Sequence, residues 1–392
     1  MVALHRIAVE NFLSLRSVDV TLGQLSVLVG PNGAGKSNLL DAIRFLGDTA
    51  RFDLQPTLDR RGGFAEVLFK GRGGGKRIKF TIEAVATAHA HDNARDEYTL
   101  EVSRYNVPSG PVLRRTEEFK FKRIQGPGRR ITVKGARFDL DDGRGAPRSR
   151  SVRAQTAGLA TLQKLGDDAG GAQVRELASL FETFRVFDID SAAARRPSVL
   201  EPRPSLASDA SNLASFLLWL SMEHPEVYQL LEADLAYVLP GFERLELRPV
   251  GGSAESRVIH LKEAGIAEPI PLARASFGTV RALALFAMLH DPEPPKLTCV
   301  EEIDHGLHPY ALDRIVERLR SASRRTQLLI ATHSPALVNR LRPEELIVCE
   351  RDVASGASRI PAIDAALVRQ MTQQSDLTLG ELWFSGALGG AL

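Results

Sequence analysis

A glycine-rich stretch near the N-terminus combines the residue types that bind phosphate. Residues 30–37 read GPNGAGKS, follow an apolar run at 24–29, and precede a segment (37–46) with leucine and isoleucine at helical spacing. Glycines let backbone N–H groups turn toward phosphate oxygens, and a helix start adds the positive end of its dipole. The pattern predicts a phosphate loop in which Lys36 reaches the β- and γ-phosphates of a nucleotide and Ser37 binds Mg²⁺. The residues predicted to surround the phosphates are Asn32, Gly33, Ala34, Gly35, Lys36, Ser37 and Asn38.

Two acids stand at the end of a distant apolar segment, residues 297–302, which reads LTCVEE. Open α/β sheets bind ligands at the carboxyl ends of their strands, so Glu301 and Glu302 are expected beside the phosphate loop. Strand side chains alternate, which gives the two carboxylates different directions. We assign Glu301 to Mg²⁺, through water, and Glu302 to orienting or deprotonating an attacking water. Two acids that merely end a strand are the alternative, and the phosphate loop upstream argues against it.

A histidine and a serine–glycine turn complete the set. His333 follows an apolar run at 327–331 and is predicted to be catalytic, through a hydrogen bond to the γ-phosphate. Ser276 and Gly278 precede a helical segment, and such a helix start is a second anion site. Each subunit already has one phosphate site, its own phosphate loop. We therefore expect the second anion site to serve a nucleotide held by a partner subunit.

These elements, in this order, resemble the ATP-binding-cassette (ABC) superfamily, and within it the branch of SMC proteins, RecF and the ATPase half of OLD-type nucleases. The stand-alone bacterial AAA family ATPases of that branch are the most similar group. The resemblance implies an α/β fold, namely a P-loop NTPase of ABC/SMC-head type with a parallel core sheet, an antiparallel β lobe and a helical insertion. The segments that carry it are IAVENFLSL at 7–15, GPNGAGKSN at 30–38, ASFGT at 275–279, VEEIDHGLHP at 300–309, ATHSP at 331–335 and LGELWFSGALGG at 379–390.

The resemblance also implies a mechanism. Two heads sandwich two ATP molecules in a homodimer, with Mg²⁺ as the metal, and hydrolysis yields ADP and phosphate. Ser276 and Gly278 then contact the γ-phosphate bound by the other chain. Asp304 and His308 lie in or beside the D-loop, at the dimer interface.

The sequence departs from the family pattern at several points. Phe277 and Thr279 replace a glycine and a glutamine of the family's signature, although the serine and second glycine are kept. The glutamine of the Q-loop has no clear equivalent, and Gln55 is the nearest candidate. Ser14 or Arg16 could contact adenine, and either could equally be a surface residue.

Periodicity divides the chain into three parts. We predict an N-terminal lobe with the phosphate loop (1–153), a helical insertion (154–240) and a C-terminal lobe with the signature, the acids and the histidine (241–392). Within the first part, four alternating runs at 77–134 predict an antiparallel meander, followed by a basic loop at 141–153.

Helical spacing covers 157–187 and 209–237, and no sustained heptads predict a long coiled coil. The 59 residues after His333 are too few for the TOPRIM nuclease domain of OLD enzymes. We therefore expect any nuclease activity to come from a separate chain.

Composition sets limits on the class of protein. The chain has 392 residues, of which 44% are hydrophobic and 25% charged, as in ordinary soluble proteins. No apolar run approaches the roughly 20 residues of a membrane span, so no membrane association is expected. Two cysteines and the lack of a secretory signal favour the cytoplasm.

The charge distribution leaves one question open. The net charge is +2, but the segment 60–153 contains 22 Lys and Arg against 11 Asp and Glu. Such a segment either grips the backbone of double-stranded DNA or is a set of solvated strands and loops. The candidate DNA contacts are Arg114, Arg115, Lys120, Lys122, Arg123, Arg129, Arg130, Arg144, Arg148, Arg150 and Arg153.

Three functions follow as alternatives. ATP-dependent dimerisation of heads could drive or gate a DNA-associated process, in repair or phage defence. The ATPase could instead be a scaffold that controls a separately encoded nuclease or toxin. A nucleotide-gated switch with negligible turnover is the third, and the Glu301–Glu302 pair argues against it.

Overall fold

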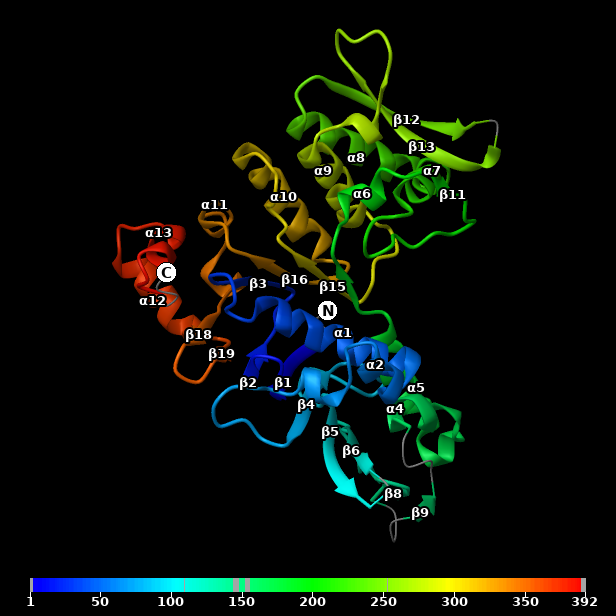
Figure 1. Cartoon of the computed structure of the whole chain (residues 1–392), viewed down its shortest axis with the longest axis vertical. Helices are drawn as coiled ribbons and strands as arrows, with labels where there is room; N and C mark the ends of the chain where they lie inside the picture. The colour runs from blue at the N-terminus through cyan, green and yellow to red at the C-terminus, as the bar shows by residue number, and fades with distance from the viewer. Residues whose placement is uncertain (1–2, 109, 144–147, 152–155, 252, 389–392) are drawn as a thin grey trace.

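The structure, a computed structural model, describes residues 3–108, 110–143, 148–151, 156–251 and 253–388. Figure 1 shows a central parallel sheet, an antiparallel sheet on one side of it, and a lobe of helices with a smaller sheet on the other. The expected combination of parallel core sheet, antiparallel β lobe and helices is therefore confirmed.

The elements run along the whole chain. The strands are β1 (Leu4–Phe12), β2 (Leu15–Thr21), β3 (Leu25–Val29), β4 (Arg77–Ala84), β5 (Asp96–Val107), β6 (Gly110–Phe121), β7 (Arg129–Lys134), β8 (Arg137–Asp141), β9 (Arg148–Ser151), β10 (Arg185–Phe187), β11 (Ser198–Val199), β12 (Phe242–Val250), β13 (Ser253–Glu263), β14 (Ile270–Pro271), β15 (Leu297–Glu301), β16 (Gln327–Thr332), β17 (Leu346–Val348), β18 (Glu350–Asp352) and β19 (Ala357–Arg359). The helices are α1 (Lys36–Phe52), α2 (Leu54–Asp59), α3 (Phe64–Val67), α4 (Gly158–Thr161), α5 (Gly171–Glu182), α6 (Ser191–Ala194), α7 (Leu213–Glu223), α8 (Pro225–Val238), α9 (Phe277–Leu289), α10 (Pro309–Ala322), α11 (Pro335–Val338), α12 (Ala365–Gln374) and α13 (Leu379–Phe384), with short 3₁₀ turns at 162–164, 167–169, 272–274 and 343–345.

The central sheet places β3 between two strands from the far end of the sequence, in the order β10-β15-β16-β3-β17, with parallel pairing throughout. All five residues of β3 are buried, as expected of a strand covered on both faces. Its side chains alternate between two apolar clusters. Leu28 packs with the cluster that contains α1, whereas Val27 and Val29 pack with the cluster of α7 to α10. The parallel order brings the carboxyl ends of β3, β15 and β16 to one edge, where the candidate site lies.

The antiparallel sheet has eight strands in the order β2-β1-β4-β5-β6-β7-β8-β9. The alternating runs predicted at 77–134 form β4 to β7, so the predicted meander is confirmed. Helix α1 packs between this sheet and the central one, and Phe45 stacks on Phe80 of β4 with ring centroids 5.1 Å apart. The basic loop predicted at 141–153 contains strand β9, while its residues 144–147 and 152–153 lie outside the described residues.

The segment predicted as helical at 157–187 ends instead in strand β10, which pairs with β15 in the central sheet. The prediction was wrong there because three residues are too few to show a period, and the partner strand lies far along the chain. The predicted helical insertion therefore contributes strand β10 to the central sheet. The domain boundaries at 153 and 240 stay a prediction. Residues 209–237 are mainly helical, in α7 and α8.

Candidate functional site

The phosphate loop joins β3 to α1 in a tight turn. Gly33 and Gly35 have φ of 79° and 101°, in the left-handed region that favours glycine. A Cβ on Gly35 would lie 2.0 Å from the Ser358 hydroxyl, so glycine is also required for space. Helix α1 begins after Gly35 without a side-chain cap, which leaves the backbone N–H groups of its first turn for a ligand.

Lys36 lies over the same loop. Its ammonium group donates to the carbonyl oxygens of Gly30 at 2.6 Å and Pro31 at 3.0 Å. Burial lowers the pKa of the Lys36 ammonium group. The positive charge is thus held inside the curve of the loop, where phosphate oxygens would lie.

The loop meets the first of the two acids across the sheet edge. The Ser37 hydroxyl donates to the Glu301 carboxylate at 2.7 Å, although 264 positions separate the two residues. A hydroxyl and one carboxylate fit Mg²⁺, which keeps several waters and is otherwise held by substrate phosphates. No group of three or more potential metal-binding side chains occurs among the described residues, so a closed, all-protein metal site is not indicated there.

The second acid points elsewhere. Glu302 is exposed, has a φ of 48°, and its carboxylate lies 3.4 Å from His305 Nδ1. Its backbone N–H donates to the carbonyl of Ala331 at 2.9 Å, which fixes the turn against β16. The two carboxylates therefore have different partners, one on the phosphate loop and one on the turn after β15.

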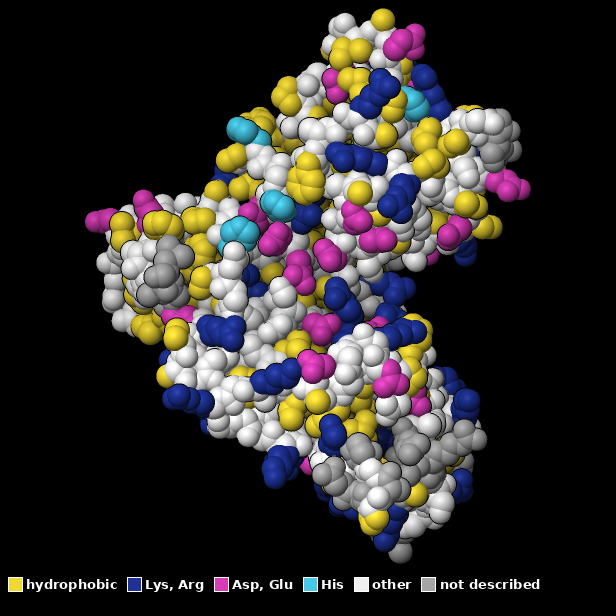
Figure 2. Space-filling model, in the orientation of Figure 1, with side chains coloured by type: hydrophobic (Ala, Val, Ile, Leu, Met, Phe, Trp, Pro, Cys, Tyr) yellow, Lys and Arg dark blue, Asp and Glu magenta, His cyan; other side chains and the backbone are white. Residues whose placement is uncertain are grey.

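The predicted histidine follows β16 and is exposed. In the part of the chain that the structure describes, the His333 side chain makes no hydrogen bond. Its neighbour Thr332 donates to the Asp304 carboxylate at 2.6 Å, which ties the end of β16 to the turn after β15. Figure 2 shows histidine and acidic side chains gathered near the middle of the visible face, in the area that Figure 1 gives to β15, β16 and α10.

The signature turn, residues 276–278, lies on a different element. The Ser276 hydroxyl caps α9 by accepting from the Thr279 backbone N–H at 3.1 Å. Phe277 is 41% exposed and packs on the ring of His305, with centroids 5.2 Å apart. A Cβ on Gly278 would lie 2.3 Å from the Gly306 carbonyl oxygen. The structure thus joins Ser37 to Glu301, but no described hydrogen bond joins the signature turn to residues 32–38.

Two residues near the site were missed by the sequence reasoning. Arg281, in an otherwise apolar helix, is buried and donates to the backbone carbonyls of Glu301 and Glu302. The signal was one charged residue inside an apolar run. Ser358 of β19 lies 2.6 Å from Ser14 Oγ, to which the Asn38 amide also donates at 2.6 Å. No local pattern marked Ser358, because the contact joins residues 344 positions apart.

A cavity of about 420 Å³ opens beside these serines. Ser14, Asn38 and Arg351 supply its polar groups at the phosphate-loop end, and Phe69 contributes an aromatic wall. Of the two candidates for adenine contact, Ser14 lines this cavity, whereas Arg16 lines a separate one. The other lining residues are Leu13, Glu66, Leu68, Lys70, Gly71 and Gly356. Gln55 lies on α2, where its side chain donates to Asp59.

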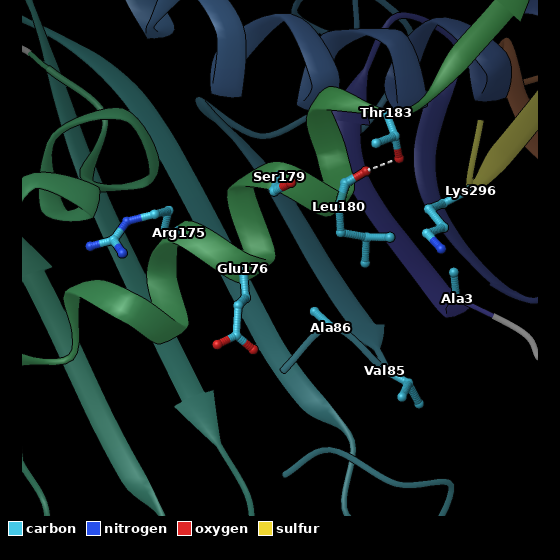
Figure 3. Close-up of a pocket in the computed structure, with 9 residues that line it drawn as sticks. All are labelled: Ala3, Val85, Ala86, Arg175, Glu176, Ser179, Leu180, Thr183 and Lys296. Atoms are coloured by element: carbon cyan, nitrogen blue, oxygen red, sulfur yellow. Dashed lines mark hydrogen bonds between the residues drawn. The ribbon is translucent and has the colours of Figure 1, made fainter. Parts of the chain in front are cut away.

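A larger cavity of about 550 Å³ lies away from this edge (Figure 3). It is lined by one face of α5 together with residues 3, 85, 86 and 296. Its lining contains none of the predicted site residues, so we do not assign the nucleotide to it.

Comparisons with known proteins identify the family. The protein-family model described as "AAA domain, putative AbiEii toxin, Type IV TA system" matches residues 25–339 of this chain. This chain belongs to that AAA-domain family. The family, a short match to an OLD nuclease and a fold shared with SMC heads support the resemblance to ABC/SMC/OLD-like ATPases.

The curated relatives match short segments. An OLD nuclease of Thermus scotoductus is 52% identical over 46 residues, which are 12% of this chain and 9% of that protein. The chromosome partition protein Smc of Methanocaldococcus jannaschii is 40% identical over 79 residues, 17% of this chain and 7% of that protein. The chain thus spans less than a tenth of either relative.

Solved structures match over nearly the whole chain. An SMC head bound to the C-winged helix domain of ScpA has a TM-score of 0.58 at 16% identity and covers 91% of this chain and 97% of its own. The Pyrococcus furiosus Smc head with an extended coiled coil, bound to the C-terminal domain of ScpA, has a TM-score of 0.56 at 14% identity, with 95% and 99% covered. At these identities the likeness shows the SMC-head fold alone.

The basic segment of this AAA-domain protein is largely paired within its own sheet. Arg115 is only 1% exposed and lies 3.1 Å from the buried carboxylate of Glu117, so its expected contact with DNA is wrong. Lys120 and Lys122 pair with Glu97. Arg129, Arg130 and Arg148 bond Gln173, Glu118 and Asp142. Arg144 and Arg153 lie outside the described residues.

Proposed function

We propose that the chain binds ATP with Mg²⁺ and hydrolyses it to ADP and phosphate. The observation that carries this proposal is the 2.7 Å contact between Ser37 and Glu301, which brings a phosphate loop and a strand-end acid to one point. The AAA-domain match and the SMC-head fold support it. In this assignment the loop residues 32–38 hold the phosphates, and Lys36 exchanges its carbonyl partners for phosphate oxygens.

The remaining residues divide the chemistry. Mg²⁺ bound by Ser37 and, through water, by Glu301 would neutralise charge on the phosphate oxygens. Glu302 orients the attacking water and accepts its proton, since its carboxylate is exposed and contacts His305, whereas that of Glu301 contacts Ser37. His333 donates to the γ-phosphate, consistent with a ring that the described residues leave without a hydrogen bond.

We further propose that the catalytic unit is a homodimer that sandwiches two ATP molecules. Ser276 and Gly278 then contact the γ-phosphate held by the other copy, and Asp304 and His308 lie near the interface. Ser276 is exposed at the start of a 13-residue helix, and no described hydrogen bond joins it to residues 32–38, which supports this arrangement.

The process that hydrolysis drives has two candidates. One is a DNA-associated step, in repair or phage defence. The other is control of a separately encoded nuclease or toxin partner, favoured by the ion pairs that occupy much of the basic segment. The family description, which mentions a toxin system, points the same way.

The cytoplasm is the proposed location. Both cysteines are free and buried, and burial raises the pKa of the Cys349 thiol to about 12, so neither needs an oxidising compartment. No helix in the described part of the chain is long and apolar enough to cross a membrane.

Steady-state ATP turnover by the purified chain, with and without double-stranded DNA at low salt, tests these proposals. Turnover that needs Mg²⁺ and is lost in Glu302→Gln supports the ATPase. ATP binding without turnover would favour the alternative of a nucleotide-gated switch. Stimulation by DNA would favour the DNA-associated process, and indifference to DNA the protein partner.

A further inference from the structure

Arg281 occupies a position where a charge is costly. It lies in α9, whose residues 280–289 are all buried, and its own side chain is 5% exposed. A buried guanidinium is tolerated when its N–H groups are satisfied by acceptors. Burial lowers the pKa of the Arg281 guanidinium, which expresses the same cost.

The acceptors of Arg281 are backbone carbonyls at the two acids. One guanidinium nitrogen donates to the carbonyl of Glu301 at 2.9 Å and to that of Glu302 at 2.6 Å. A second nitrogen reaches the carbonyl of Ile189, just after β10, at 3.4 Å. Arg281 therefore joins the signature helix to the end of β15 and to the neighbouring edge of the sheet.

One nitrogen of Arg281 can donate to the carbonyls of two consecutive residues only where the backbone turns. In an extended strand, successive carbonyls point in opposite directions, and one nitrogen cannot reach both. At Glu302 the backbone leaves the strand with a φ of 48°, in the left-handed region that is unfavourable for a residue with a Cβ. Arg281 and the carbonyl of Ala331 hold this turn from two sides.

We infer that Arg281 is a positioning residue that sets the direction of the Glu301 and Glu302 carboxylates by holding their backbone. The expected change in kcat rests on the proposed ATPase function. The expected change in backbone stability at the two acids does not, because the carbonyl contacts of Arg281 exist without nucleotide. Among the described residues, no hydrogen bond or ion pair joins Arg281 to residues 32–38, so its direct effect is on the backbone of the two acids.

The test compares Arg281→Met, Arg281→Lys and a matched control, Arg325→Met. Arg325 also donates to a backbone carbonyl of α9, that of Leu289 at 2.9 Å, but at the opposite end of the helix. We expect Arg281→Met to lower kcat by about tenfold or more while the Kd for ATP stays within about twofold, since each charged hydrogen bond lost costs a factor of this order. Arg281→Lys keeps the positive charge but lacks the planar guanidinium with its several N–H donors. Its kcat should lie between those of Arg281→Met and the wild type.

Hydrogen exchange supplies the readout that does not need turnover. In Arg281→Met, backbone amides of residues 298–308 should exchange faster, while those of 27–40 in the same variant and those of 298–308 in Arg325→Met should not change. Wild-type exchange at 298–308, or wild-type kcat, in Arg281→Met would overturn the inference. If the wild-type chain does not hydrolyse ATP, the proposed function fails, and exchange at 298–308 still decides the positioning role. If Arg281→Met does not fold, the same two criteria apply to Arg281→Lys.

Discussion

The phosphate loop and the signature turn both place a helix start on the molecular surface, but their surroundings differ. The phosphate loop meets its chemical partners within the chain, since Ser37 reaches Glu301 and Lys36 is held over the loop carbonyls. The described contacts of the signature turn lie within α9 and the turn after β15: the Ser276 cap, the ring contact of Phe277 with His305, and the close approach of Gly278 to Gly306. The phosphate loop thus has partners within the described chain, whereas Ser276 and Phe277 of the signature turn are exposed.

In the proposed sandwich dimer, this difference separates a region that works within one chain from a region that depends on a second copy. A helix start with an exposed serine offers anion-binding N–H groups that the described part of its own chain does not use. If the signature turn serves the other subunit's nucleotide, changes in the two regions should have separable effects on binding, turnover and assembly.

Removal of the loop cation should have the largest effect. Lys36→Ala is expected to weaken ATP binding by about a hundredfold or more, because a charge-assisted hydrogen bond contributes up to about 3 kcal/mol and this lysine makes more than one. Equilibrium binding of a fluorescent ATP analogue measures it. Lys120→Ala, which removes a lysine paired with Glu97, is the control and should bind like wild type. Unchanged binding in Lys36→Ala would mean that the phosphate loop is not the nucleotide site.

Loss of the second acid should affect turnover and leave binding intact. Glu302→Gln is expected to lower kcat by about a hundredfold or more, the size of a general-base contribution, and to accumulate the ATP-bound dimer. Single-turnover hydrolysis and light scattering with ATP measure the two effects. Glu317→Gln, which changes a surface acid paired with Arg314, is the matched control. Hydrolysis at the wild-type rate in Glu302→Gln would refute its role as the catalytic carboxylate.

A bulky charge on the signature turn should separate binding from assembly. Ser276→Arg is expected to keep the Kd for ATP within about twofold, because no described hydrogen bond joins Ser276 to its own phosphate loop, and to abolish the ATP-dependent dimer, because an unpaired buried charge costs several kcal/mol. Sedimentation with ATP measures dimerisation. Ser321→Arg on the exposed face of α10 is the control. If Ser276→Arg dimerises with ATP, the signature turn does not serve the nucleotide of the other subunit as proposed.

The smallest predicted effect concerns the serine pair that braces the phosphate loop from β19. Ser358→Ala removes one partner of the 2.6 Å Ser14–Ser358 bond, and Ser14 keeps the amide of Asn38. We expect a loss of about 1 kcal/mol in the free energy of unfolding, as for a typical hydrogen bond. Urea unfolding measures it, with the exposed Ser17→Ala as the control. A stability equal to wild type would show that the pair does not brace the loop.

The sequence predicted those parts of the fold that carry local patterns. The period of two at 77–134 predicted the meander, because each strand there buries one face. The phosphate loop was visible because glycines at fixed spacing are required by backbone geometry at Gly33 and Gly35. Strand β10 was not visible, since its three residues have no period and are held by pairing with β15.

The site could be predicted only as far as side chains carry recognisable chemistry. Arg281 acts on backbone carbonyls, which every residue has, so no residue type marked its targets. Arg115 shows the converse error. Its charge suggested a surface contact, but the residue lies two positions before Glu117 on the same buried face of β6, where the Glu117 carboxylate also accepts from the Tyr98 hydroxyl at 2.9 Å. Whether a charge on a strand is exposed or buried depends on which face of the sheet is covered, and composition does not set that.

The position of β3 in the central sheet has a consequence for synthesis on the ribosome. Its two neighbours, β16 and β17, begin at Gln327 and Leu346, so this apolar strand emerges long before either flank can be made. The meander, by contrast, pairs strands that follow one another and can form early. The phosphate loop therefore gains its native surroundings only after residues 327–348 have been made. Until then, a nascent chain exposes a strand that is prone to wrong pairing.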